Sequence, residues 1–150
     1  MQNQYLSDFQ IIGNSVRKFK IKNDFVILPE NKNTKRKIDV SHRIESVKLS
    51  EEEFSGILTL NVKVTVSSGK EKYVIDLSVE GCFIAPLEMG EETFTEMLQL
   101  NGLTSLYSIA RGFVQSTTSQ TLISGSILLP MFNVAAYSKD LGANDSEANS

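Results

Sequence analysis

Two neighbouring runs in which every second residue is apolar limit the folds open to this chain. The first run covers 57–66 and the second covers 72–83. A period of two is typical of strands that pack one face on a core and turn the other to water. The intervening Ser67-Ser68-Gly69-Lys70 suits a tight turn, because glycine accepts positive φ. The two runs therefore predict an antiparallel hairpin.

Two earlier segments predict further strands. Residues 16–22 alternate, with Phe19 and Ile21 on one face and lysines on the other, and residues 38–49 alternate more weakly. Pro29, which cannot donate to a sheet, ends the apolar run between them. Residues 1–15, with Tyr5 and Phe9, read as an arm or a short amphipathic turn. Together with the hairpin, these segments predict a four-stranded antiparallel sheet.

Two helices follow the predicted sheet. Glu91, Glu92 and Thr93 suit a helix N-terminus, and Asn101-Gly102 is a good stop. The second helix, about 104–121, carries an apolar stripe at helical spacing. An extended apolar run then bends at Gly125 and leads through Pro130 to a short helix capped near Asn133. We predict an α+β fold with both helices on one face of the sheet; the stripe consists of Leu103, Leu106, Tyr107, Ala110 and Val114.

Composition predicts one domain, 1–137, followed by a disordered acidic tail, 138–150, that cannot bury apolar area. The net charge of −3 argues against a nucleic-acid binder, and the basic 32–37 segment reads as a solvated loop. No apolar run reaches the ~18 residues of a membrane span, and the N-terminus lacks a signal-peptide pattern. With a single cysteine, we expect a soluble protein of a reducing cytoplasm.

The residues of catalysis and metal binding are sparse. His42 is the only histidine, so neither a histidine metal cluster nor a Ser/His/Asp triad can form. Cys82 lies in an apolar run, as a buried structural cysteine does. No phosphate-binding loop motif occurs, and the carboxylates cluster at turns. We therefore predict that the chain is not an enzyme and needs no metal or cofactor.

Aromatic and methionine side chains lie at element ends and in loops. Such flexible and flat groups suit a groove that accepts many apolar sequences. The alternative is that the same residues complete an ordinary core. The predicted groove consists of Phe25, Phe83, Leu87, Phe94, Met97, Met131, Phe132 and Tyr137.

The end of the second helix is rich in serine and threonine over 115–121, and these residues are poor helix formers. Small polar residues allow two copies of a helix to approach closely, so this helix is a candidate contact between subunits. Arg111 either pairs with a carboxylate or lines that contact. We assign the predicted interface to Leu106, Ala110, Arg111, Val114 and Ser116.

The order of these parts resembles that of the protein-export chaperone family SecB, over about residues 16–137. Ile109-Ala110-Arg111 is similar to the family's Tyr-Ala-Arg, and Glu80-Gly81-Cys82-Phe83 is similar to its Gly-Ile-Phe bend. Gly125, followed by residues 127–133, is similar to its Gly…Leu-Leu-Pro-Pro-Ile-Asn-Phe segment.

The resemblance implies a homotetramer, a dimer of dimers with long helices between two sheets. It implies ATP-independent holding of unfolded preproteins in apolar grooves, which keeps them competent for the Sec pathway. It also implies that the exposed sheet face, with Val74 and Asp76, docks the translocase motor SecA. Lys18 and Lys22 stand where that face is acidic in the family, which is a departure from its pattern.

Two other functions remain open. Related SecB-like proteins are chaperones dedicated to the antitoxin of a toxin–antitoxin system, and this chain could be one of them. A small-ligand carrier or an enzyme on a helix-on-sheet fold is the third alternative. We expect no nucleic-acid partner and no insertion into a membrane.

Overall fold

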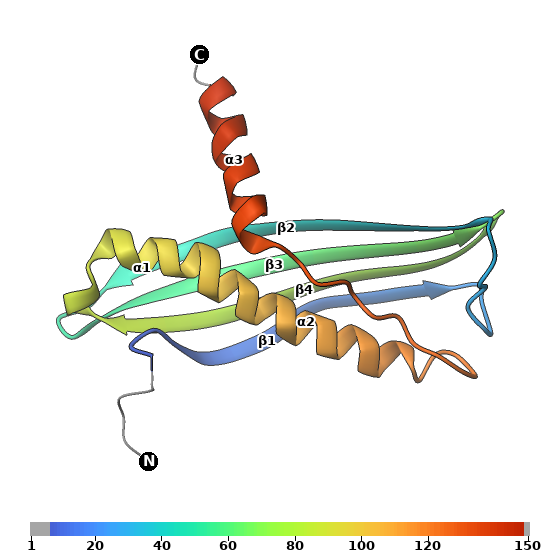
Figure 1. Ribbon diagram of the computed structural model, residues 1–150. Helices are drawn as coiled ribbons and strands as arrows, with labels where there is room; N and C mark the ends of the chain where they lie inside the picture. Colours follow the sequence, from blue (N-terminus) through green and yellow to red (C-terminus); the bar gives the residue numbers. More distant parts are fainter. Residues whose placement is uncertain (1–6, 149–150) are drawn as a thin grey trace.

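The computed structural model describes the backbone of residues 7–148 and their side chains, except those of Ser46 and 142–148. Its main feature is a four-stranded antiparallel sheet in the order β1-β4-β3-β2, with helices on one face (Figure 1). The predicted α+β architecture is confirmed. The strands are β1 (Gln10–Asn23), β2 (Thr34–Leu49), β3 (Glu53–Ser68) and β4 (Glu71–Pro86).

The predicted hairpin is formed by β3 and β4, which pair from Glu53 opposite Pro86 to Ser68 opposite Glu71. Gly69 has a φ of 61° at the turn, a conformation that glycine adopts without steric cost. Both strands extend beyond the predicted ranges, because the buried alternation continues at the far end of the sheet. The sequence therefore predicts the pairing and the inward face, but not the full strand length.

The strand β1 begins earlier than predicted. Residues 10–15, predicted as part of an arm or turn, pair with the end of β4. Phe9 precedes them and is buried, and its ring stacks on that of Phe83 with centroids 5.2 Å apart. Tyr5 lies outside the described residues. The start of the chain thus lengthens the sheet and closes one end of the core.

The helical layer is continuous where the sequence predicts a break. A 3₁₀ turn (Leu87–Met89) leads into α1 (Glu91–Met97), a π turn (Leu98–Gly102) and α2 (Leu103–Thr118). The predicted stop at Gly102 is wrong, because this residue has helical angles, φ −62° and ψ −48°. A Cβ there would lie 3.3 Å from Leu58 Cδ2. The glycine therefore serves close packing on the sheet rather than helix termination.

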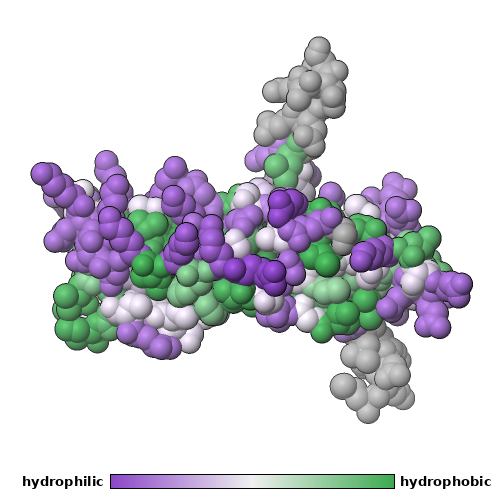
Figure 2. Space-filling model, turned by 180° about the vertical axis from the view of Figure 1, so that it is seen from behind, coloured by the Kyte–Doolittle hydropathy of each residue, from purple (hydrophilic) through white to green (hydrophobic). Residues whose placement is uncertain are grey.

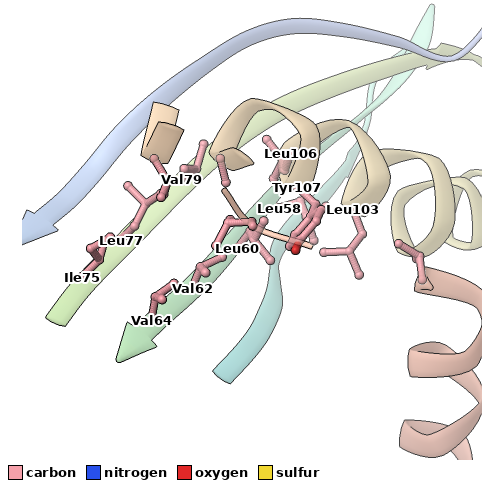
Figure 3. Close-up of a cluster of buried hydrophobic side chains, with 14 of the residues drawn as sticks. Leu58, Leu60, Val62, Val64, Ile75, Leu77, Val79, Leu103, Leu106 and Tyr107 are labelled. Atoms are coloured by element: carbon pink, nitrogen blue, oxygen red, sulfur yellow. The ribbon is translucent and has the colours of Figure 1, made fainter. Parts of the chain in front are cut away.

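Glycines on the sheet let the helices lie close to it. A Cβ at Gly81 would lie 2.7 Å from Leu106 Cδ2, and one at Gly56 would lie 2.7 Å from Leu98 Cδ1. Gly81 pairs regularly with Asn14 and Leu58, so it forms no β-bulge. Figure 3 shows the apolar side chains of β3 and β4 meeting those of α2. They include Leu58, Leu60, Val62, Val64, Ile75, Leu77, Val79, Leu103, Leu106 and Tyr107, all buried.

After α2 the chain returns along the sheet, bends at Gly125 (φ 86°) and enters α3 (Val134–Ala148). The helix α3 points away from the sheet (Figure 1), and Val134 is the only buried residue among its described side chains. The sequence predicts a disordered tail from Ser138, whereas the backbone stays helical to Ala148. Asn133 Oδ1 accepts a 3.0 Å hydrogen bond from Ala136 N and caps the start of the helix, as the sequence predicts. Residues 149–150 of the predicted tail lie outside the described residues.

Candidate functional site

An open groove lies between β2 and the return segment 127–132. It consists of two hollows, of about 420 Å³ and about 280 Å³, which share Ile38 and Pro130 in their walls. We call the combined feature the β2 groove. Its walls are mainly apolar, and β2 is an edge strand of the sheet. The lining residues are Arg36, Ile38, Asp39, Val40, Val64, Val66, Tyr107, Ile127, Leu128, Pro130, Phe132 and Tyr137.

Side chains of α2 fix the return segment that forms one wall of this groove. Tyr107 Oη donates to the carbonyl oxygen of Pro130 at 2.6 Å, and Arg111 Nε donates to that of Leu129 at 2.7 Å. Thr118 Oγ1 accepts a buried 2.8 Å hydrogen bond from Ile127 N. Since the segment has no regular secondary structure, these three contacts supply partners for its backbone.

The end of the groove is aromatic. The ring of Phe132 lies between those of Tyr107 and Tyr137, with centroids 5.0 Å and 5.2 Å away. His42 of β2 joins this cluster, with its Nδ1 3.0 Å from Tyr137 Oη. Burial lowers the pKa of His42 and raises that of Tyr137. The first turn of α3 is therefore attached to the sheet through the chain's only histidine.

The structure separates the predicted groove residues into three groups. Phe132 and Tyr137 line the β2 groove, and Met131 next to them is 83% exposed. Leu87 and Met97 are half-buried at the α1 end. The prediction is corrected for the other three residues, because their side chains belong to the core; they are Phe25 at 8%, Phe83 at 1% and Phe94 at 0% exposure.

The core placement of two of these residues has a direct cause. Phe83 continues the inward face of β4 and stacks on Phe9, while Phe94 stacks on Phe54 with centroids 5.5 Å apart. Sequence reasoning missed the groove residues Ile38 and Val40, which it assigned only to a strand face. Their position on the strand next to the return segment could not be read from the alternation.

The residues predicted for a subunit interface mostly face the chain's own sheet. Leu106, Ala110 and Val114 are fully buried there, so their assignment to an interface between subunits is corrected. Arg111 binds the Leu129 carbonyl, and Ser116 alone lies on the exposed face of α2. The helical period explains the error, because the apolar stripe of an amphipathic helix first covers its own sheet.

The hydroxyls near the end of α2 find partners inside the helix. Thr117 Oγ1 and Thr118 Oγ1 each donate at 2.7 Å to the carbonyl four residues earlier. Such local bonds satisfy polar groups without a second subunit. The helix ends at Thr118, three residues before the predicted end at Thr121. Its exposed face is small and polar, with Thr104, Ser108, Gly112, Gln115 and Ser116.

The other face of the sheet is open and mostly hydrophilic (Figure 2). Val74 and Asp76, the predicted docking residues, line a hollow of about 590 Å³ there together with Lys20, Lys22 and Lys63. Asp76 Oδ2 lies 3.0 Å from Lys18 Nζ. The carboxylate predicted to meet a partner is thus paired within the chain.

The described part of the chain contains no group of three or more His, Cys, Asp or Glu residues placed to hold a metal ion. None of its helices is both long enough and apolar enough to cross a membrane.

The architecture is that of a class of proteins with a four-stranded antiparallel sheet, one helix-covered face and an open groove beside an edge strand. Among solved structures, the chain is similar to the Mycobacterium tuberculosis SecB-like chaperone Rv1957, solved in complex with a ChAD peptide from the Rv1956 HigA1 antitoxin. The TM-score is 0.64 and the identity 14%, over 83% of this chain and 90% of that chain. The likeness shows a SecB-like fold.

A second solved structure, a protein of unknown function from Streptococcus agalactiae, gives a TM-score of 0.49 at 12% identity, over 82% of this chain and 97% of that chain. No protein-family model matches the chain, and comparison with curated proteins gives no match.

Proposed function

We propose that this chain is an ATP-independent holding chaperone that binds extended apolar stretches of non-native polypeptide along the β2 groove. The observation that supports this most directly is the groove itself, an apolar trough made of two adjoining hollows beside an edge strand. No phosphate-binding loop motif occurs in the sequence, so holding would proceed without a nucleotide.

The geometry suits an extended chain. An edge strand offers unpaired backbone groups to a peptide, and an apolar wall takes alternate side chains of that peptide. The rim adds exposed apolar area from Leu128, 49% exposed, and Met131. Contiguous apolar surface of this kind marks binding sites on soluble proteins. The anchors from Tyr107 and Arg111 would hold the groove open before a client arrives, which lowers the ordering cost of binding.

In this proposal the chaperone acts in the cytoplasm as a homotetramer and keeps preproteins competent for the Sec pathway. The second candidate is a chaperone dedicated to one antitoxin. The complex of the structurally similar Rv1957 with an antitoxin peptide favours this second candidate. Both candidates use the same groove and differ in the number of clients.

The test is suppression of aggregation of a chemically unfolded client, without nucleotide, by the full chain. Ile38→Asp should abolish holding and Phe132→Ala should weaken it, because both change the groove walls. Ile123→Asp is the matched control, since Ile123 is 77% exposed and lies outside the groove. Equal holding by all four proteins would contradict the proposal.

Two further measurements separate the candidates. Translocation of an unfolded preprotein into membrane vesicles should rise with the export chaperone and stay unchanged with the antitoxin-specific one. Affinity capture from the native cell should return many unfolded proteins in the first case and one dominant antitoxin in the second.

A further inference from the structure

The open face of the sheet carries a concentration of positive charge at one end. In the strand register, Lys20 of β1 and Lys63 of β3 flank Asp76 of β4. One row further, Lys22 of β1 and Lys37 of β2 lie at the two edges of the sheet. The pairing register therefore brings lysines from three strands onto one surface.

This surface is hollowed. The hollow of about 590 Å³ at β1 and β4 and another of about 420 Å³ at β2 and β3 both include Lys63 in their walls. Lys35 and Lys72 line the second hollow. We call the two hollows together the basic face.

Most of the positive charge on the basic face has no carboxylate partner within the described chain. Asp76 pairs with Lys18 at 3.0 Å, and Asp39 pairs with Lys37 at 3.6 Å. Among the described residues, no ion pair is formed by Lys20, Lys22, Lys35, Lys63 or Lys72. Because the whole chain has a net charge of −3, this excess is a local property of the surface.

We propose that the basic face docks an acidic polypeptide segment of a partner protein. Charge complementarity points to an anionic partner. The apolar atoms among the residues that line the basic face point to a polypeptide. Val74 lies between Lys22 and Lys37 in the strand register, so the face offers an apolar contact that a polypeptide side chain can use and a phosphate backbone cannot.

A second copy of this chain is a poor occupant. Its two runs of consecutive acidic residues, Glu51–Glu53 and Glu91–Glu92 in the first turn of α1, lie at the opposite end of the molecule. Contact between the two different ends would be head-to-tail, which gives filaments unless the rotation closes.

The basic face and the β2 groove open on opposite faces of the sheet, and their walls share only Arg36 and Asp39 of the edge strand β2. The residues Lys20, Lys22 and Lys63 and the groove residues Ile127 and Phe132 lie on opposite faces of the sheet. A chaperone with this arrangement could hold a client and contact an acidic partner at the same time. The docking proposal therefore does not depend on the proposed holding function.

The test is fluorescence anisotropy of the full chain with fluorescein-labelled oligoglutamate of about 12 residues, an extended length that crosses the sheet. At about 50 mM salt we expect the double variant Lys20→Glu, Lys63→Glu to bind oligoglutamate at least about tenfold more weakly than the unmodified chain. The control is Lys48→Glu with Lys139→Glu, which changes net charge equally at exposed sites outside the basic face. Raising salt to about 300 mM should weaken binding to the unmodified chain.

Three outcomes would overturn the docking proposal. The first is no binding of oligoglutamate at low salt, or equal loss in the control variant. The second is tighter binding of a duplex DNA oligonucleotide that is lost in the Lys20/Lys63 variant, which would assign the face to nucleic acid. The third is self-association in sedimentation that is lost in the same variant, which would assign it to a second copy.

Discussion

Arg111 on α2 donates from its Nε to the carbonyl oxygen of Leu129, and the two atoms lie 2.7 Å apart. The contact joins the main helix to an irregular segment that forms a wall of the β2 groove. A charged donor on a backbone carbonyl is a strong form of hydrogen bond. The rigidity of the groove therefore depends on a side chain that does not line it.

Replacing Arg111 should loosen that wall. Arg111→Met removes the donor while keeping most of the apolar stem, and we expect the free energy of unfolding to fall by about 1–2 kcal/mol. Denaturant unfolding measures this, and limited proteolysis should show faster cleavage within 127–132. Gln115→Met, on the exposed face of the same helix, should change stability by less than about 0.5 kcal/mol. Equal proteolysis of the two variants would contradict the anchoring role.

The glycine contacts predict opposite effects of one substitution at two sites. Gly81→Ala places a Cβ 2.7 Å from Leu106 Cδ2 and should destabilise by about 1–3 kcal/mol through overpacking. Gly112→Ala meets no atom within 4 Å on an exposed helix face and should stabilise by about 0.5–1 kcal/mol. Thermal unfolding of both variants is the measurement. A loss of stability at Gly112 that depends on protein concentration would instead reveal a packed subunit contact on α2.

Two phenylalanines should separate stability from binding. Phe83→Ala empties a site in the core and should cost about 3–5 kcal/mol. Phe132→Ala removes a ring from the groove and should lower affinity for an apolar peptide while the chain stays folded. Unfolding curves and peptide titrations of both variants provide the comparison. If Phe83→Ala unfolds no more easily than Phe132→Ala, the core assignment is wrong.

The stability of the chain should depend on pH through His42. Burial lowers the pKa of His42 below its ordinary value, so the unfolded chain takes up a proton at higher pH than the folded chain. The free energy of unfolding should therefore decrease as pH falls through about 6.5, and above that pH the effect should be absent. Denaturation of the wild type and of His42→Gln between about pH 7.5 and 5.5 tests this.

Since His42 is the only histidine, the difference between these two pH profiles isolates its contribution. Tyr137→Phe keeps the ring contact and removes the hydroxyl that lies 3.0 Å from His42 Nδ1. It should reduce stability near neutral pH but keep a pH dependence between about pH 7.5 and 5.5. Parallel profiles for the wild type and His42→Gln would show that this histidine is not desolvated in the folded chain.

The sequence predicts the parts of the fold in which apolar residues recur at the period of a strand or a helix. The alternation of β3 and β4 specifies their inward faces, and the stripe from Leu103 to Val114 specifies the buried side of α2. It does not predict the continuous helical layer, because Gly102 is a stop signal in local terms and a packing residue in the folded chain.

The candidate groove is predicted only in part. Phe132 and Tyr137 are indicated by their residue type and position, but Phe83 has the same type and lies in the core. The alternation of β4 turns Phe83 inward, and the ring of Phe9 covers it once β1 has paired with β4. A contact across 74 residues of sequence leaves no local pattern.

The close packing of Leu106 on Gly81 has a consequence for the dimensions of the β2 groove. Leu106 packs directly on the sheet because Gly81 has no methyl group in that position. Tyr107 and Arg111 lie on the same helix, so their distance from the sheet is set by the same contact. The distance of α2 from the sheet thus sets the distance of the Leu129 and Pro130 carbonyl groups from the sheet. The width of the groove that receives a bound chain therefore depends on the lack of a side chain at Gly81, which lies on β4 and not on the edge strand where the groove opens.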